Sequence, residues 1–207
     1  MKLLLASTLA CTVLANCCLP QGNRREQHEV RTVKANSCMF NGSGVVPNCI
    51  LQAGNGNISI APEVLKQLRF DSHGLAPVFS EDDVRHGWMY VNRKGNVVVS
   101  GVASFDNWAD EFSDGLVRIV VSNKYGFADR EGRIIIKPTY DWASPFQHGS
   151  TDVCNECREM CMMPGGAVEI QSVAGGCDHR IRVGGDWFKV DKKGRVVTKL
   201  PHHSLIC

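Results

Sequence analysis

Three short segments that share one spacing limit the folds open to this chain more than any other feature. They read WMYVNRKGNVVV, YGFADREGRIII and WFKVDKKGRVVT, and they begin at Trp88, Tyr125 and Trp187. In each, an aromatic residue is followed after four positions by Asn or Asp, after three more by Gly, and then by a β-branched run. Such a turn is favoured because the side-chain oxygen accepts from nearby amides and glycine tolerates a positive φ. Each segment is therefore predicted to form a β-hairpin.

A second element recurs between these hairpins. WADEFSDGL from Trp108 and WASPFQHGS from Trp142 share the pattern Trp-Ala-x-x-Phe-x-x-Gly, and FDSHGLAPV is a weaker relative. Trp88 and Tyr125 are about 37 residues apart, whereas Trp187 follows Tyr125 after one further period plus about 25 residues. The excess indicates an insert that contains CNECREMCMMPGG. Periods of this size are typical of a repeat array, in which each unit buries its apolar face against its neighbours.

The predicted fold class is all-β, with tandem β-hairpin repeats. The repeat domain is expected at 61–207, and its cysteine-rich insert at about 150–176. One short N-terminal helix is predicted in APEVLKQL, at 61–68, because Pro62 suits a first helical turn and the leucines fall at helical spacing.

The middle copy, SDGLVRIVVSNKYGFADREGRIIIKPTYDWASPFQHG, resembles the WG-repeat (KWG-repeat) family. The resemblance covers roughly 65–200, with Tyr125 in place of the family tryptophan. The outer copies, at Gly87–Trp88 and Trp187–Phe188, are degenerate, as end-capping repeats often are. The resemblance implies a β-rich bacterial repeat scaffold, often exported, with no established common catalytic site. The matching family positions are Lys124, Tyr125, Gly126, Phe127, Asp129, Gly132, Ile135, Ile136, Pro138, Tyr140, Asp141, Ala143 and Phe146.

The first residues are typical of a targeting segment. MKLLLASTLACTVLANCCLP has one lysine, then an uncharged apolar run, then polar sequence containing proline. The run is shorter than the ~20 residues that span a bilayer, so it favours a secretory signal peptide over a membrane helix. We assign 1–16 to this signal peptide and the polar, Gly- and Asn-rich residues 17–60 to a leader or tether. A buried N-terminal strand or helix is the structural alternative.

Two processing routes remain open. Val13–Ala15 has the small residues that a signal peptidase favours. LANCC resembles a bacterial lipobox that would acylate Cys17, although Asn16 departs from the small residue expected there. Cleavage after Ala15 leaves an odd number of cysteines, whereas acylation of Cys17 leaves an even number for pairing. Parity therefore favours the lipoprotein signal.

Ten cysteines in an exported chain predict disulfides, because an oxidising compartment lets them form and persist. Spacing in the insert also permits a zinc site with either Cys177 or His179 as the fourth ligand. A redox pair at Cys154 and Cys157 is a third hypothesis, without the βαβ setting of thioredoxin-like motifs. Disulfides are the preferred interpretation, and no metal or cofactor is assigned. The candidates are Cys38, Cys49, Cys154, Cys157, Cys161 and Cys177.

All four tryptophans lie in the repeats. Trp88 and Trp187 hold the hairpin aromatic position and are predicted to be core residues. Trp108 and Trp142 occupy equivalent places, and if exposed they would lie on one face about one repeat apart. Such aromatics bind sugar rings or anchor a protein partner, since they offer a large rigid contact area. The alternative is that both pack between adjacent repeats.

The predicted function is that of a non-catalytic, exported binding protein of the bacterial cell envelope. Its expected location is the periplasm or the outer membrane, or outside the cell after secretion. The expected partner is a protein or an envelope polysaccharide, with membrane contact only through an N-terminal lipid. A net charge of +2 with scattered basic residues argues against nucleic acid, and no catalytic residue is assigned. The alternatives are an immunity- or inhibitor-type lipoprotein that blocks a toxin or enzyme, and a thiol-redox or metal-binding protein.

Overall fold

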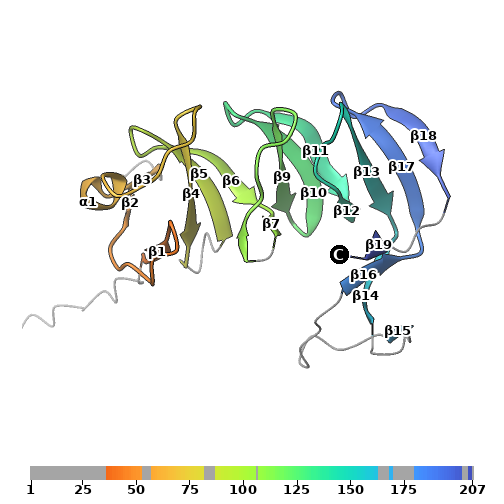
Figure 1. Cartoon of the computed structure of the whole chain (residues 1–207), viewed down its shortest axis with the longest axis horizontal. Coiled ribbons are helices and arrows are strands. Elements are labelled where there is room, and N and C mark those ends of the chain that lie inside the picture. Colours follow the sequence, from red (N-terminus) through yellow and green to blue (C-terminus); the bar gives the residue numbers. More distant parts are fainter. Residues whose placement is uncertain are drawn as a thin grey trace, which may run out of the picture. The chain divides into compact units, whose positions relative to one another are not determined.

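The protein is described by a computed structural model over residues 36–52, 57–81, 87–105, 107–162, 168–169, 180–201 and 205–206. The chain divides into two compact units, 1–32 and 33–207, and these residues all belong to the second. The predicted all-β fold, with tandem hairpins, a short N-terminal helix and a cysteine-rich insert, is confirmed (Figure 1). The predicted signal peptide and Cys17 lie outside the described residues. Within those residues, no helix has the length and apolar character needed to cross a membrane.

Each repeat unit contains three antiparallel strands that are neighbours in one sheet. In the first unit these are β4 (Leu75–Ser80), β5 (Gly87–Asn92) and β6 (Val97–Val102), followed by the short pair β7 (Ser104–Phe105) and β8 (Trp108–Ala109). The second unit contains β9 (Leu116–Val121), β10 (Lys124–Asp129), β11 (Ile134–Tyr140) and β12 (Trp142–Ala143). The third contains β13 (Ser150–Asn155), β17 (Asp186–Asp191) and β18 (Val196–Leu200).

The remaining elements precede or interrupt the repeats. Before them come β1 (Cys38–Met39), β2 (Ile50–Gln52), β3 (Ile58–Ile60) and α1 (Pro62–Leu65). The insert supplies β14 (Arg158–Met162), β15 (Val168–Glu169) and β16 (Arg180–Val183), which join β19 (Leu205–Ile206) in one sheet. Units one and two share a sheet of order β1-β4-β5-β6-β9-β10-β11, and the third unit forms the sheet β12-β13-β17-β18.

The three predicted turns are closed by the same hydrogen bonds. Oδ1 of Asp129 accepts from the backbone N–H groups of Glu131, at 3.0 Å, and Arg133, at 2.9 Å. Asn92 and Asp191 accept from the corresponding N–H groups in their own turns. The repeated Asn or Asp therefore serves the turn, as its position in the sequence predicts.

The turns of the second and third units each pack on the unit before them. The Gly132 backbone lies directly against the Val98 carbonyl in β6, and a Cβ on Gly132 would overlap that oxygen. A Cβ on Gly194 would lie 3.5 Å from the side chain of Ile136 in β11. The turn of each unit thus contacts the third strand of its predecessor, and glycine is needed at Gly132 because only it permits that approach at φ +81°.

The hydrophobic cores lie between units and join them. One core joins Trp88 and Val99 of the first unit to Val117 and Ile119 of the second. The next is formed by residues of the second and third units, namely Leu116, Phe127, Ile136, Ala143, Phe146, Val153 and Val190. A unit removed from the array would expose apolar surface at both of its boundaries, which is the usual basis of repeat-protein stability.

The structure differs from the predicted leader over its described part, 36–52 and 57–60. Cys38 and Cys49 form a disulfide, and both are fully buried with Phe40 and Ile50 in a core shared with β4 and β5. The N–H of Ile60 donates to the Gly95 carbonyl at 2.8 Å, so β3 meets the first turn. These residues cap the array, because Cys38, Phe40, Cys49, Ile50 and Ile60 pack in one core with side chains of β4 and β5.

The insert replaces a tight turn. In the second unit, Ser122 and Asn123 connect β9 to β10 with φ of 50° and 61°. In the third unit, β13 pairs along its whole length with β17, from Ser150↔Asp191 to Asn155↔Asp186. Residues 150–155, where the sequence places the start of the insert, are therefore part of the repeat sheet, and the chain leaves that sheet after Asn155.

A buried ion pair fixes the junction of the first two units. Asp110, which follows β8, accepts from Arg118 of β9 at 2.6 and 2.9 Å, and both side chains are buried. Nη1 of Arg118 also donates to the Ala143 carbonyl at 2.7 Å, and the Tyr90 hydroxyl donates to the Asp110 carbonyl at 2.8 Å. A single guanidinium thus connects the ends of two consecutive units.

Replacing Asp110 by alanine should lower the free energy of unfolding by about 3–5 kcal/mol, because Arg118 would keep a buried charge without its carboxylate. Urea denaturation measures this loss. Lys199→Gln, which removes an exposed ion pair with Asp186, is the control and should cost no more than about 1 kcal/mol. Similar small losses in both variants would contradict the assigned role of the buried pair.

The glycine of the WG motif is explained by a close backbone approach. A Cβ on Gly126 would lie 2.6 Å from both the Ile136 carbonyl oxygen and the Pro138 nitrogen, where β11 shifts its register against β10. Gly126→Ala should therefore destabilise the fold by about 1–3 kcal/mol in urea denaturation. Gly44→Ala, with open space around its Cβ, should change stability by less than about 0.5 kcal/mol. An unchanged stability of Gly126→Ala would show that the strands separate freely there.

Candidate functional site

Trp108 is the most exposed aromatic side chain that the structure describes on the repeats. It lies in β8, one residue after Asn107, whose φ of 68° turns the chain, and its side chain is 51% exposed. Its ring stacks on that of buried Trp88 at 5.8 Å between centroids with 30° between planes. Phe79 meets the same Trp88 edge-on at 5.3 Å. Trp108 is thus the outer member of a packed aromatic row, which holds the exposed indole in one orientation.

The loop after β1 borders this ring. A Cβ on Gly42 would lie 3.8 Å from Cη2 of Trp108. One face of Trp108 rests on Trp88, its edge approaches Gly42, and the remainder is open. We name this exposed indole with its Trp88 support the Trp108 platform. Such a surface can stack on a sugar ring or receive an apolar side chain of a protein.

Trp142, the second predicted binding residue, is placed differently. It is only 9% exposed and packs at 5.6 Å from Trp187. Trp142, Cys154, Trp187 and Leu200 are successive cross-strand partners on β12, β13, β17 and β18, so they form one row across the third sheet. The two tryptophans therefore do not form an exposed pair, and the candidate site is reduced to Trp108.

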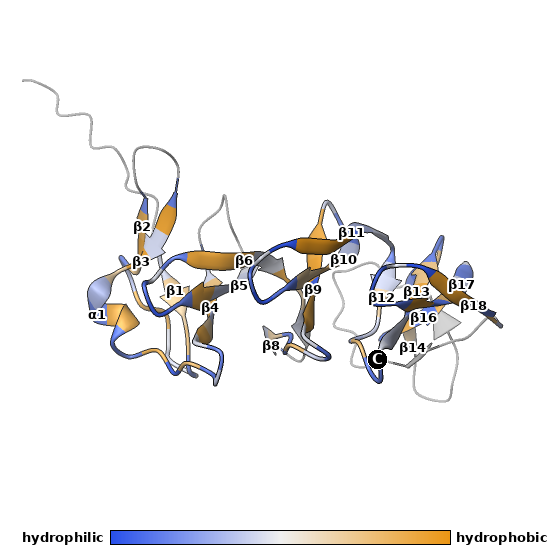
Figure 2. Cartoon of the chain, turned by 90° about the horizontal axis from the view of Figure 1, so that it is seen from above, coloured by the Kyte–Doolittle hydropathy of each residue, from blue (hydrophilic) through white to orange (hydrophobic). Residues whose placement is uncertain are grey.

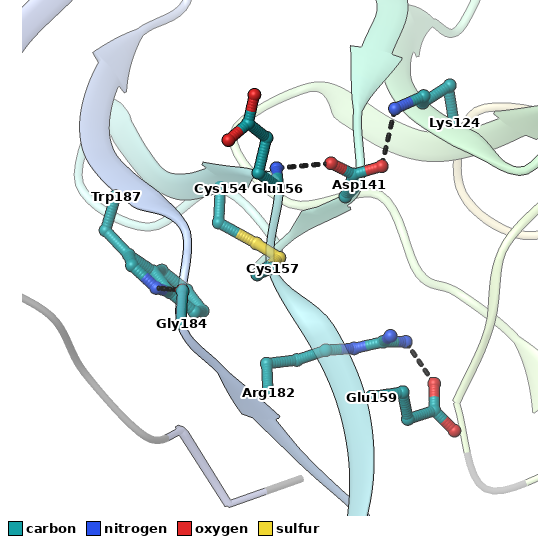
Figure 3. The surroundings of a disulfide bond; sticks show 9 residues. All are labelled: Lys124, Asp141, Cys154, Glu156, Cys157, Glu159, Arg182, Gly184 and Trp187. Carbon is teal, nitrogen blue, oxygen red and sulfur yellow. Dashed lines mark hydrogen bonds and ion pairs between the residues drawn. A yellow bond between two sulfur atoms is a disulfide. The ribbon is translucent and has the colours of Figure 1, made fainter. Parts of the chain in front are cut away.

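A disulfide between Cys154 and Cys157 closes the base of the insert (Figure 3). Both cysteines are buried, in a cluster with Trp142 and Trp187. The Trp187 indole N–H donates to the Gly184 carbonyl at 2.8 Å, which ties the end of the insert to β17. Arg182 and Glu159 pair across β16 and β14. These contacts fix how the inserted strands leave the repeat sheet.

The bonding state of the cysteines bears on the zinc and redox hypotheses. Cys154 and Cys157 are bonded to each other, and Cys161 is also disulfide-bonded. A cysteine in a disulfide cannot supply the thiolate that zinc binds. Cys154 is inaccessible and Cys157 nearly so, whereas thiol exchange needs access to a sulfur. Cys177 and His179, proposed as fourth ligands, lie outside the described residues.

Asp141 organises the polar side of this region. Its Oδ1 accepts from Nζ of Lys124 at 2.5 Å, and its Oδ2 accepts from the backbone N–H of Glu156 at 2.6 Å. The hydrogen bond from Lys124 lowers the pKa of Asp141, and the N–H of Glu156 adds to the effect against partial burial. Glu156 itself has a φ of 59°, so Asp141 helps to hold the strained residue between the two cysteines.

A shallow hollow of about 510 Å³ lies elsewhere, between two turns of the first unit. It is lined by the turn residues Ser72, His73, Gly74, Asn92, Arg93, Lys94 and Asn96. Asn92 ends β5, whereas Trp88 stands near the start of that strand, so the hollow is separate from the Trp108 platform. Across the described residues, no group of three His, Cys, Asp or Glu side chains is arranged to hold a metal ion.

The sequence left exposure and burial open for both tryptophans and treated them alike, whereas Trp108 is exposed and Trp142 is buried. Both outcomes depend on side chains from other strands, and the shared Trp-Ala pattern carries no sign of the difference.

Comparison with protein families identifies the repeat unit. The model for the WG containing repeat matches residues 88–125 and 125–154 in two consecutive copies. These copies span the hairpins of the first and second units and reach into β13. No curated protein and no solved structure matches the chain.

The lowered pKa of Asp141 makes part of the stability pH-dependent. The contribution of a carboxylate whose folded pKa is depressed is complete above the unfolded pKa, about 3.9, and is lost as the pH falls through the folded value. The melting temperature of the wild type should therefore exceed that of Asp141→Asn at neutral pH. The difference should shrink below about pH 4, where Asp141 becomes protonated. A difference that stays constant down to about pH 2 would contradict the assigned charge interaction.

Proposed function

The chain is a WG-repeat protein, and from this premise we propose that it is an exported, non-catalytic binding protein that uses the Trp108 platform to recognise a partner. The observation that carries the proposal is the half-exposed indole of Trp108, stacked on buried Trp88. Large aromatic side chains with few rotatable bonds bind at low entropic cost, and a packed support lowers that cost further.

Support for export comes from the disulfides. Cys38–Cys49 closes the cap before the repeats, and Cys154–Cys157 closes the base of the insert. Bonds of this kind persist in oxidising compartments and are rare in the reducing cytosol. They agree with the apolar N-terminal segment, which resembles a secretory signal. The periplasm or cell envelope is accordingly the proposed location.

Support for a non-catalytic role comes from the charged groups whose pKa is lowered. Asp191 is held by Arg195 and by backbone N–H groups in its turn. Burial opposes ionisation of Asp129, but the hydrogen bonds from Arg133 outweigh it and lower its pKa. Both carboxylates close repeat turns. The lowered pKa of each carboxylate is therefore explained by its role in the fold, with no need of a role in binding a substrate.

Binding is tested with Trp108→Ala, and Val121→Ala, at another exposed apolar side chain, is the matched control. The probes are soluble peptidoglycan fragments in a fluorescence titration and an envelope extract in a cross-linking pull-down. Loss of the Trp108 contact should weaken the affinity for the bound partner about 30-fold, whereas the Val121→Ala variant should bind as the wild type does.

The two probes separate the candidate partners. Binding of the fragments would identify an envelope polysaccharide, and one stoichiometric protein in the pull-down would identify an inhibitor-type partner. Equal binding by Trp108→Ala and the wild type in both assays would overturn the proposal.

A further inference from the structure

Exposed aliphatic side chains recur in two units at one position of the repeat, the start of the third strand. In β11, Ile134 is 56% exposed and Ile135 40%; in β18, Val196 is 60% exposed and Val197 62%. These four make up half of the large hydrophobic side chains that are exposed in the described parts of the chain. Neighbouring residues of a strand point to opposite faces, so both faces are open at the start of each strand. The first-unit equivalents, Val97 and Val98, are half-buried.

Positive charge accompanies these side chains. Lys192 and Lys193 stand in the turn before β18, and Lys137 follows the exposed isoleucines in β11. All three are exposed and form no ion pair with another described residue. The turn aspartates do not cancel this charge, because Asp129 and Asp191 are already paired with Arg133 and Arg195.

The two groups are adjacent. A Cβ on Gly194, in the turn that carries Lys192 and Lys193, would lie 3.5 Å from the side chain of Ile136 in β11. Figure 2 shows hydrophilic turns beside the hydrophobic strands β6 and β11. We name the exposed side chains of 134–137 and 192–197 the basic–apolar edge.

We propose that the basic–apolar edge binds the surface of an anionic lipid bilayer. Aliphatic side chains at this edge would enter the boundary between headgroups and acyl chains, while the lysine ammonium groups contact lipid phosphates. Each basic residue near an anionic surface adds to attraction, and the apolar contacts add a term that does not depend on charge.

An anionic polysaccharide is the competing partner, and the contribution of the aliphatic side chains to binding distinguishes it from a lipid surface. A soluble polyanion would gain from Lys137, Lys192 and Lys193 but little from Ile134, Ile135, Val196 and Val197. A lipid surface uses both kinds of side chain at once. Because this edge does not include Trp108, the test below and that of the proposed function can fail separately.

The test is co-sedimentation of the full chain with vesicles of phosphatidylcholine, with and without phosphatidylglycerol. The apolar N-terminal segment contributes equally in every variant, so the increase caused by phosphatidylglycerol is the quantity compared. Lys192→Gln with Lys193→Gln should lower this phosphatidylglycerol-dependent increase in binding about 30-fold. Added salt should have a similar effect. Val196→Ser with Val197→Ser should lower the partition to both kinds of vesicle roughly three- to tenfold, because the apolar contacts do not depend on lipid charge.

The control is Lys66→Gln with Arg69→Gln, which removes the same charge from exposed residues at and just after the end of α1. It should bind vesicles as the wild type does, and circular dichroism checks that each variant is folded. An equal loss of vesicle binding in the control would show that only net charge matters and would overturn the assignment of the site to the basic–apolar edge. Tighter binding to dextran sulfate than to vesicles, with no effect of Val196→Ser and Val197→Ser, would overturn the lipid assignment in favour of a polyanion.

Discussion

The backbone contact between a turn and the preceding unit is the constraint on which the array depends. Gly132 lies so close to the Val98 carbonyl that any side chain would overlap it. This contact sets the separation of the first two units, and that separation allows Trp88 and Val99 to reach Val117 and Ile119 in a common core. The turn therefore has two roles, reversing the chain locally and spacing the units. Its Asp or Asn serves the first role and its Gly serves both.

The hairpins were predictable because their determinants are local. The Asn or Asp, the Gly and the β-branched run act within one segment, and the three turns form with the hydrogen bonds that their spacing indicates. The helix predicted at 61–68 also forms but is shorter, at Pro62–Leu65, with Lys66 as its C-terminal capping residue. What local chemistry could not show was the cap formed by 36–52 and 57–60. Its polar composition is typical of a tether, and its order depends on Cys38 and Cys49, which are bonded and buried against β4 and β5.

Only part of the candidate site was predictable, because local sequence does not show the contacts made by distant strands. Trp108 and Trp142 hold identical places in the Trp-Ala pattern, yet one is half-exposed and the other buried. Their local sequences are alike, so the exposure of each tryptophan is determined by the strand that pairs with it. In the second unit β12 pairs with β13, which brings Trp142 beside Cys154 and Trp187. In the first unit β8 pairs with β7, so Trp108 stacks on Trp88 at the end of the aromatic row and stays half-exposed.

The two proposed surfaces stand at opposite ends of the repeat strands, and this follows from the register of β5. Trp88, which supports the platform, is the second residue of that strand, whereas Asn92, which opens the first turn, is the last. At about 3.3 Å per residue, the two ends are separated by more than 10 Å. The later turns follow the first, because each packs on the third strand of the unit before it. A protein held on a lipid surface by its turns would therefore carry Trp108 on the side away from the lipid, where a partner in the aqueous phase can reach it. Lipid attachment and partner recognition are compatible in this fold because the hairpin separates them by the length of a strand.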